Sequence, residues 1–262
     1  MASNRASETA VAVVLWAVVL GPALAPDAAA GGRAVNDDGD GAVNRLTAEE
    51  QAQGWELLFD GGELGKWRGY KMDRVPDGWS VVGGVVRFAR PDAPEAKRSD
   101  LITREQYGDF ELRLEWKLTP GGNSGVMFRV SEDSERSYHT GPEMQILDNA
   151  GHRDGGSPLT STGANYGLHA PVRDVTRPVG EWNEVRIVAH GPHVEHWLNG
   201  VEVVAYELWT EDWRAKVKAT KFAQWPRYGL NERGHIALQD HDDEVWFRNL
   251  KVRRLDAGAA AQ

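Results

Sequence analysis

The stretch ELRLEWKL, residues 111–118, carries the clearest secondary-structure signal in the chain. Leu112, Leu114, Trp116 and Leu118 alternate strictly with charged residues. Successive side chains of a β-strand point to opposite faces, so this pattern predicts a strand with one buried face and one solvated face. Such a strand is typical of a sheet that covers a hydrophobic core on one side only.

Similar runs occur on both sides of this strand. Further candidate strands cover residues 79–88, 124–130, 142–148, 183–191, 193–208, 234–240 and 244–255. Within residues 193–208, Asn199-Gly200 lies between two alternating runs and predicts a tight hairpin turn. Thr47 followed by Glu50 predicts a short capped helix ahead of the strands. Many short strands separated by turn residues predict an all-β fold, an antiparallel two-sheet β-sandwich or jelly roll.

Length and composition are typical of a globular protein with one large domain or two small ones. The chain has 262 residues, of which 41% are hydrophobic and 26% are charged. Its net charge of -9 argues against a nucleic-acid partner, because phosphate binding needs a basic surface. The chain has no cysteine, so it can form neither a disulfide nor a lipidated cysteine anchor. We predict a flexible linker over residues 31–45, which are rich in Gly, Asp and Asn, and one domain over residues 46–257.

Residues 1–30 are typical of a secretory signal peptide. Arg5 precedes the apolar run Ala10–Leu20, and small residues follow it, with expected cleavage after Ala25 or Ala30. The alternative is an uncleaved membrane anchor, but an apolar core of about a dozen residues is shorter than the roughly twenty that span a bilayer. We therefore predict export to the periplasm or the extracellular space, with no stable membrane span after cleavage.

The period-two alternation also assigns polar side chains to one sheet face. In residues 124–130 it places Val130 in the core and Arg129 on the opposite face. The same rule places further hydrogen-bonding side chains on the non-core face: Glu143, Gln145, Gln239 and His241. Each of them alone is compatible with an ordinary surface residue. Together they suit a polyhydroxylated ligand, because they offer several donors and acceptors on one face.

Two long segments, residues 149–180 and 207–233, lack a strand pattern. Long loops in a compact domain are usually functional, so both segments are predicted to wall a site. Most of the eleven Trp residues are expected to pack in the core. Trp213 and Trp225, in the second segment, are predicted to line a pocket where a sugar ring can stack.

Several blocks of the sequence together carry a family resemblance. In order, the chain contains WELLFDGGELGKWRGY, NSGVMFRV, GPEMQILDN, EWNEVRIVAHGPHVEHWLNG, TKF and IALQDH, the last followed by VWFRNLKVRRL. Over residues 54–255 it resembles the 3-keto-disaccharide hydrolase domain family. The resemblance implies a concanavalin A-like jelly roll, usually exported, that cleaves glycosides whose sugar carries a ketone at carbon three.

The chain departs from the family pattern at two places. The family commonly has Gly after the QDH segment, where this chain has Asp242, Asp243 and Glu244. It commonly has Ser before the KF pair, where this chain has Thr220. The second change keeps the hydroxyl group, whereas the first adds carboxylates beside the expected site and bears on its substrate or metal preference.

A conventional glycosidase mechanism is disfavoured. It requires two carboxylates about the scissile bond, which laminarinase-type jelly rolls supply as two Glu four residues apart on one strand. Here Glu143 is followed on the same face by Gln145 and Leu147, so the second carboxylate is missing. A 3-keto sugar permits elimination instead, because the ketone acidifies the proton on carbon two. A base removes that proton, the group on carbon one departs, and water can add to the resulting enone.

This chemistry needs a base, an acid and a stabiliser of the oxyanion. We predict that His241 or Glu143 is the base and that the other, or Tyr166, is the acid. The resemblance implies a role for Lys221, which with Arg129 would stabilise the negative charge at the former ketone. The residues predicted to bind substrate are Asn123, Arg129, Gln145, Asp148, Gln239, Asp240, Trp213 and Trp225.

Two alternatives stay open at this point. No cofactor is certain, and a divalent metal is one option, because Asp148, His152 and Asp154 are of metal-ligand type. Their spacing fits no specific metal motif, so a capped polar turn is the favoured explanation. The expected partner is a small carbohydrate, a 3-keto-glycoside. The alternative function is a non-catalytic, lectin-like carbohydrate-binding module, since a fold alone does not grant activity.

Overall fold

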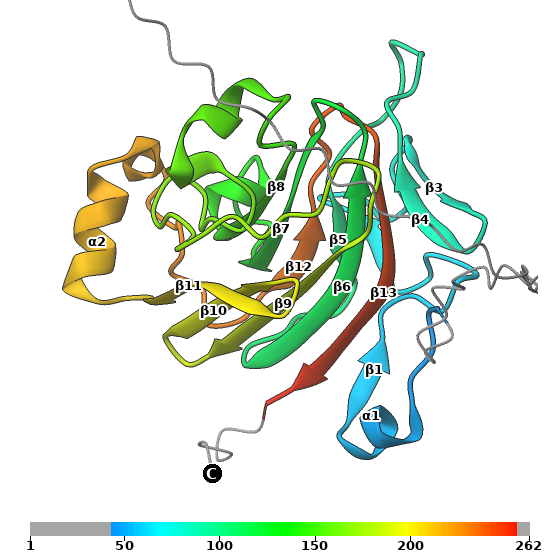
Figure 1. Ribbon diagram of the computed structural model, residues 1–262, viewed down its shortest axis with the longest axis horizontal. Coiled ribbons are helices and arrows are strands. Elements are labelled where there is room, and N and C mark those ends of the chain that lie inside the picture. Colours follow the sequence, from blue (N-terminus) through cyan, green and yellow to red (C-terminus); the bar gives the residue numbers. More distant parts are fainter. Residues whose placement is uncertain (1–42, 256–262) are drawn as a thin grey trace, which may run out of the picture. The chain divides into compact units, whose positions relative to one another are not determined.

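Two antiparallel β-sheets dominate residues 43–255, the part of the chain that the computed structural model describes (Figure 1). The eight-stranded sheet has the order β11 (Val201–Glu207), β10 (His193–Leu198), β9 (Asn183–His190), β6 (Phe110–Leu118), β13 (Val245–Arg254), β4 (Val85–Phe88) and β3 (Trp79–Val82), with β1 (Trp55–Leu57) also paired to β13. The five-stranded sheet has the order β2 (Trp67–Gly69), β5 (Leu101–Thr103), β12 (His235–Leu238), β7 (Asn123–Val130) and β8 (Glu143–Leu147). The predicted signal peptide, residues 1–30, lies outside the described residues, as does most of the predicted linker.

Helices are short and lie in the connections. They are α1 (Ala48–Ala52), α2 (Glu211–Lys218) and the 3₁₀ turns η1 (Ser137–His139), η2 (Arg153–Gly156), η3 (Pro158–Thr160) and η4 (Lys221–Gln224). The predicted cap of α1 is confirmed, since the Thr47 side chain accepts from the Glu50 N–H and the Glu50 side chain accepts from the Thr47 N–H. In the described part of the chain, no helix has the length and apolarity that crossing a membrane requires.

The all-β, two-sheet prediction is confirmed, with differences in detail. Asn199-Gly200 forms the turn between β10 and β11, as predicted. Residues 79–88 form a hairpin rather than one strand, because Gly83 and Gly84 adopt φ angles of 58° and 78° and turn the chain between β3 and β4. The three-residue strands β1, β2 and β5 were not predicted, since alternation over three residues gives no signal.

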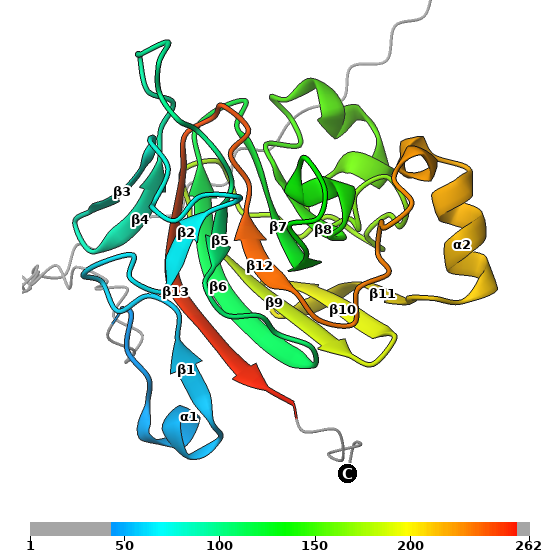
Figure 2. The ribbon, with the colours of Figure 1, turned by 180° about the vertical axis from the view of Figure 1, so that it is seen from behind.

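The hydrophobic core lies between the two sheets. The four apolar residues of the alternating stretch in β6 are at most 2% exposed, which confirms that this face is buried. The five-stranded sheet contributes inward side chains to the same cluster, among them Val126, Phe128, Met144 and Ile146. The opposite face of the five-stranded sheet does not contribute to this core. Figure 2 views the molecule from the side of that face.

The alternation fails at the end of β7, where the chain forms a bulge. Val130 pairs with His235 and Met127 pairs with Ala237, so β7 has one residue more than β12 over this interval. Arg129 has a φ angle of 50°, and its guanidinium donates to the carbonyls of Gly108 and Gly191 and to the Asp109 carboxylate.

The bulge reverses two face assignments. Val130 packs with Met127 in a small cluster separate from the main core, and the buried Arg129 side chain reaches toward the eight-stranded sheet. The predictions that Val130 lies in the main core and that Arg129 lies on the polar face are therefore wrong.

Candidate active site

A cavity of about 340 Å³ lies against the non-core face of the five-stranded sheet. Its lining residues are Asn123, Tyr138, Glu143, Gln145, Tyr166, Lys221, Phe222, Trp225, Gln239 and His241. The structure thus brings together all four predicted catalytic residues and four of the predicted binding residues. Its size falls within the range of roughly 300–1,000 Å³ found for small-molecule sites.

Strand pairing explains why the sheet residues meet here. In the antiparallel register of β7 and β8, Gly125 lies opposite Gln145 and Met127 lies opposite Glu143. Gln239 directly follows β12, and its N–H donates to the Gly125 carbonyl over 2.9 Å. Regular pairing therefore carries the side chains of Glu143, Gln145 and Gln239 to one face, as the alternation predicted.

The carboxyl group of Glu143 occupies the space above Gly125. A Cβ atom at position 125 would lie 2.0 Å from Oε1 of Glu143, a distance no real side chain tolerates. Glu143 is 7% exposed, and no described residue forms a hydrogen bond with its carboxyl group. Burial raises its pKa to about 8. The positive charge of Lys221 reduces this effect, and the negative charge of Asp100 reinforces it. At neutral pH this carboxyl group is therefore protonated and able to donate a hydrogen bond.

The two long segments, residues 149–180 and 207–233, supply the wall of the cavity opposite the sheet. The N–H of Tyr166 donates to the Glu143 carbonyl over 3.0 Å, which fixes the first segment beside β8. Lys221 begins η4, and its Nζ atom lies 4.4 Å from the centre of the Tyr166 ring. The Thr220 hydroxyl caps η4 by accepting from the Phe222 N–H, so the departure from Ser keeps the capping group. Figures 1 and 2 both show the segment after β8 beside the segment that follows α2.

The cavity contains buried polar atoms that lack a protein partner. Within residues 43–255 these include Oδ1 of Asn123, Oε1 of Gln239 and Nδ1 of His241. Nε2 of His241 lies 3.4 Å from Nδ2 of Asn123, and Nδ1 lies 3.7 Å from the Asp243 carboxylate. Buried polar groups in proteins are normally hydrogen-bonded, so this concentration of unsatisfied atoms indicates a site for a polar ligand.

An aromatic group closes one side of the cavity. The Trp225 ring stacks on His139 at 4.4 Å and meets Tyr138 edge-on at 5.4 Å. Trp225 therefore lies where the sequence placed it. Trp213 does not, because it is 1% exposed and stacks between Tyr206 and Tyr228 inside the protein.

Two further predicted binding residues lie outside the cavity. Asp148 accepts hydrogen bonds from the N–H groups of Gly121, Ala150 and Gly151, which is the capped-turn alternative. Asp240 forms two contacts with Arg98, of 2.5 and 3.0 Å, and faces an adjoining cavity. Neither residue lines the candidate active site.

A different set of metal-ligand residues meets around His241, which lines the cavity. Among the described residues, His152, His241 and Asp243 bring ligand atoms within 4.8 Å of one another, whereas the sequence suggested Asp148, His152 and Asp154. Nδ1 of His152 accepts a hydrogen bond of 3.1 Å from the Asp154 N–H. The neutral ring then carries its proton on Nε2, so this histidine is a poor metal ligand unless that hydrogen bond is broken.

Sequence reasoning missed Gly125, Tyr138 and Phe222. A glycine inside a strand pattern often marks a close approach of another group, and Gly125 carried that signal. Tyr138 and Phe222 lie in short 3₁₀ turns, whose side-chain directions follow neither strand nor helix periodicity.

Comparisons with known proteins find similar sequences and structures. The model of a family described as 3-keto-alpha-glucoside-1,2-lyase-like domain matches residues 54–253. A 3-keto-disaccharide hydrolase from Bacteroides thetaiotaomicron is 36% identical over 240 residues, which cover 82% of this chain and 83% of that protein. A solved structure of a candidate glycosyl hydrolase from Parabacteroides distasonis has a TM-score of 0.75 at 32% identity and covers 82% of this chain and 100% of its own. A second one from that organism has a TM-score of 0.54 at 27% identity and covers 72% and 100% of the two chains.

Proposed function

The chain belongs to the 3-keto-alpha-glucoside-1,2-lyase-like domain family, and from this we propose that it is an exported enzyme that cleaves the glycosidic bond of 3-keto-glycosides. The observation that carries the proposal is the convergence of Glu143, His241 and Lys221 on one cavity. A lectin-like module needs only aromatic platforms and hydrogen-bonding groups. An acid with a strongly raised pKa beside an imidazole and an ammonium group favours chemistry.

The first step in this proposal is removal of the proton from carbon two by His241. If the Nδ1–H of His241 faces the Asp243 carboxylate, the lone pair of Nε2 is directed toward Asn123 and the cavity. The electrons of the broken C–H bond move toward the ketone, whose oxygen becomes negatively charged. Lys221 and the neutral carboxyl group of Glu143 stabilise that oxygen, because donors gain most where charge develops.

The second step breaks the bond between carbon one and the glycosidic oxygen. The enolate electrons form the new double bond of an enone, and the proton held by His241 passes to the departing oxygen. Tyr166, held beside Glu143, is a second donor within the same wall. Addition of water to the enone then yields the free 3-keto sugar, so that the overall change is hydrolysis.

This route agrees with the carboxylate content of the cavity. Of its lining residues in the described chain, Glu143 alone carries a carboxyl group. Retaining and inverting glycosidases both require two. The elimination route needs only one acid–base group and an oxyanion site.

The test is release of a chromogenic leaving group from a 3-keto-glucoside, with the unoxidised glucoside as comparison. We expect release from the keto form alone and a loss of roughly 10²- to 10⁴-fold in His241→Ala, as for removal of a general base. His190→Ala is the matched control, since His190 lies at the end of β9 and does not line the cavity. Retained glycan binding without release from either substrate would support the lectin-like alternative instead.

Treatment with a chelator addresses the metal alternative. We expect the rate of the chelated enzyme to stay within about twofold of the untreated rate, because the tautomer of His152 disfavours coordination. A loss of activity that added divalent metal restores would assign a metal to His152, His241 and Asp243.

A further inference from the structure

A second cavity, of about 430 Å³, adjoins the candidate active site. Tyr138, Gln239 and His241 line both cavities. Glu143 and Lys221 line the first cavity and are absent from the second. A ligand longer than one ring can therefore extend from the first cavity into the second past His241.

The second cavity offers donors and acceptors of both signs. Lys71 and Arg136 contribute cations, and Glu135 contributes a carboxylate. Within the described chain, the ammonium, guanidinium and carboxylate groups of these three side chains form no hydrogen bond or ion pair with protein. An anionic ligand would call for cations alone, whereas a neutral ring bearing several hydroxyl groups can use both signs.

Ion pairs fix the floor of this cavity. Arg98 contacts Asp240 at 2.5 Å and Asp242 at 2.5 Å, which holds the segment after β12 that carries Gln239 and His241. The half-buried Asp100 accepts from the Asp240 N–H over 2.9 Å and from the Ser137 hydroxyl. The wall common to both cavities is thus held in place before a ligand binds, which lowers the entropic cost of binding.

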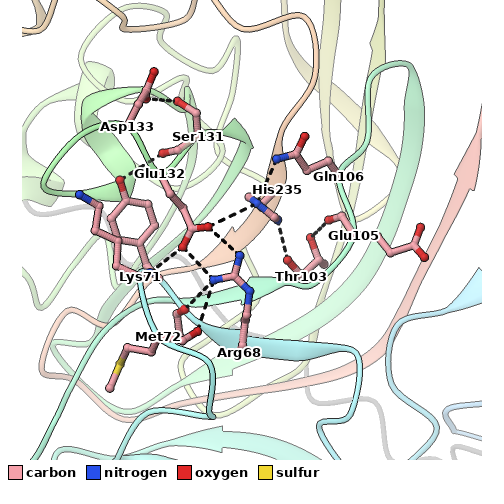
Figure 3. Close-up of polar contacts among 12 residues, drawn as sticks. Arg68, Lys71, Met72, Thr103, Glu105, Gln106, Ser131, Glu132, Asp133 and His235 are labelled. Atoms are coloured by element: carbon pink, nitrogen blue, oxygen red, sulfur yellow. Dashed lines mark hydrogen bonds and ion pairs between the residues drawn. The ribbon is translucent and has the colours of Figure 1, made fainter.

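A second network holds Lys71 at the rim (Figure 3). Arg68 donates two hydrogen bonds, of 2.8 and 2.6 Å, to the Glu132 carboxylate, which also accepts from the Lys71 N–H over 2.7 Å. Lys71 has a φ angle of 57°, which is uncommon for a residue with a side chain. The Glu132 contact stabilises this backbone conformation at a residue that lines the cavity.

We propose that the second cavity binds the leaving-group sugar of a 3-keto-disaccharide. The inference rests on the proposed function and adds to it the place in the fold where the leaving-group sugar binds. With the keto ring beside Glu143 and Lys221, the glycosidic oxygen lies at the boundary formed by Tyr138, Gln239 and His241. His241 is then near both carbon two and the departing oxygen, as transfer of one proton between them requires.

The test compares a 3-keto-disaccharide with a methyl 3-keto-glucoside, which leaves the second cavity empty. We expect the ratio of their kcat/KM values to fall about tenfold in Arg136→Ala, the size of effect expected for a lost hydrogen bond to a charged group. Glu135→Ala should lower the same ratio. Arg173→Ala is the matched control, because Arg173 is also exposed and lines neither cavity.

The outcomes separate the two proposals. Cleavage of both substrates with an unchanged ratio in both variants would overturn the subsite and leave the proposed function standing. Cleavage of neither substrate by the wild-type enzyme would overturn the proposed function and the subsite with it. A lower ratio of kcat/KM values in Arg136→Ala and Glu135→Ala, with an unchanged ratio in Arg173→Ala, supports the assignment of the second cavity to the leaving-group sugar.

Discussion

Burial keeps the carboxyl group of Glu143 protonated in the folded protein up to a pH of about 8. In the unfolded chain the same group ionises near its ordinary pKa of about 4.3. Between these values the folded state holds a proton that the unfolded state has lost, so the folding free energy becomes less favourable as the pH rises. The group that we assign to the oxyanion site is thus one that destabilises the fold at neutral pH.

The first prediction concerns this stability cost. Glu143→Gln should raise the melting temperature relative to wild type, and the gain should be larger at pH 8 than at pH 5, because the amide has no proton to lose. Thermal unfolding of both proteins at pH 5 and at pH 8 measures the gain in melting temperature. Glu202→Gln, at an exposed position, is the control. An equal gain at both pH values would mean that Glu143 titrates normally.

The second prediction concerns activity. The kcat/KM of the wild-type enzyme should fall above a pH of about 8, as Glu143 loses its proton and can no longer donate to the ketone oxygen. Glu143→Gln keeps a neutral donor, so it should lose roughly tenfold at neutral pH, less than the 10²–10³ for complete removal of an oxyanion donor. The kcat/KM of Glu143→Gln should also show no decrease above a pH of about 8. A wild-type rate that instead rises through pH 8 would make Glu143 the base.

The third prediction separates Arg129 from the site. Its buried guanidinium serves two carbonyls and the Asp109 carboxylate and stacks 5.3 Å from the Trp209 ring. Arg129→Ala should lower the free energy of unfolding by about 3 to 5 kcal/mol, as for one partner of a buried pair. Urea unfolding measures this, with Arg173→Ala as control. A variant that keeps its stability but loses much of its kcat would instead indicate that Arg129 takes part in the reaction.

At the scale of elements, the pairing of β7 with β8 positions the residues of the site. Gly125 lacks a side chain and so leaves room for the Glu143 carboxyl group. Gly125→Ala should displace the Glu143 side chain and lower kcat/KM by roughly 10²-fold, since misplacement of a catalytic group by about 1 Å has that effect. Gly65→Ala is the control, because a Cβ atom there meets nothing within 4 Å. Full activity in a folded Gly125→Ala enzyme would exclude Glu143 from the reaction.

Regular elements were also the ones that the sequence could predict. Alternation placed Glu143, Gln145 and Gln239 correctly because β7, β8 and β12 pair in register around Gly125. It failed for Arg129, since a bulge depends on a partner strand that lies far away in the sequence.

Trp213 and Asp240 could not be placed for a related reason. The direction of each is set by a tertiary partner, the stack on Tyr206 in one case and the ion pair with Arg98 in the other. Neither contact leaves a periodic signal in the sequence.

At the scale of the whole molecule, we expect the enzyme to act outside the cytoplasm. The basis is the order of charged, apolar and small residues within residues 1–30. The mature protein recovered from the periplasm or the medium should begin after Ala25 or Ala30, which N-terminal sequencing determines. Recovery of the intact chain in the membrane fraction would favour an anchor.

Removal of the proton from carbon two is the central claim, and a 3-keto-glucoside carrying deuterium on that carbon tests it most directly. The measurement compares its cleavage rate with that of the unlabelled substrate and follows the label in the product. We predict slower cleavage of the deuterated substrate and loss of the deuterium to water. Equal rates with the deuterium retained in the sugar would contradict elimination and require direct displacement at carbon one.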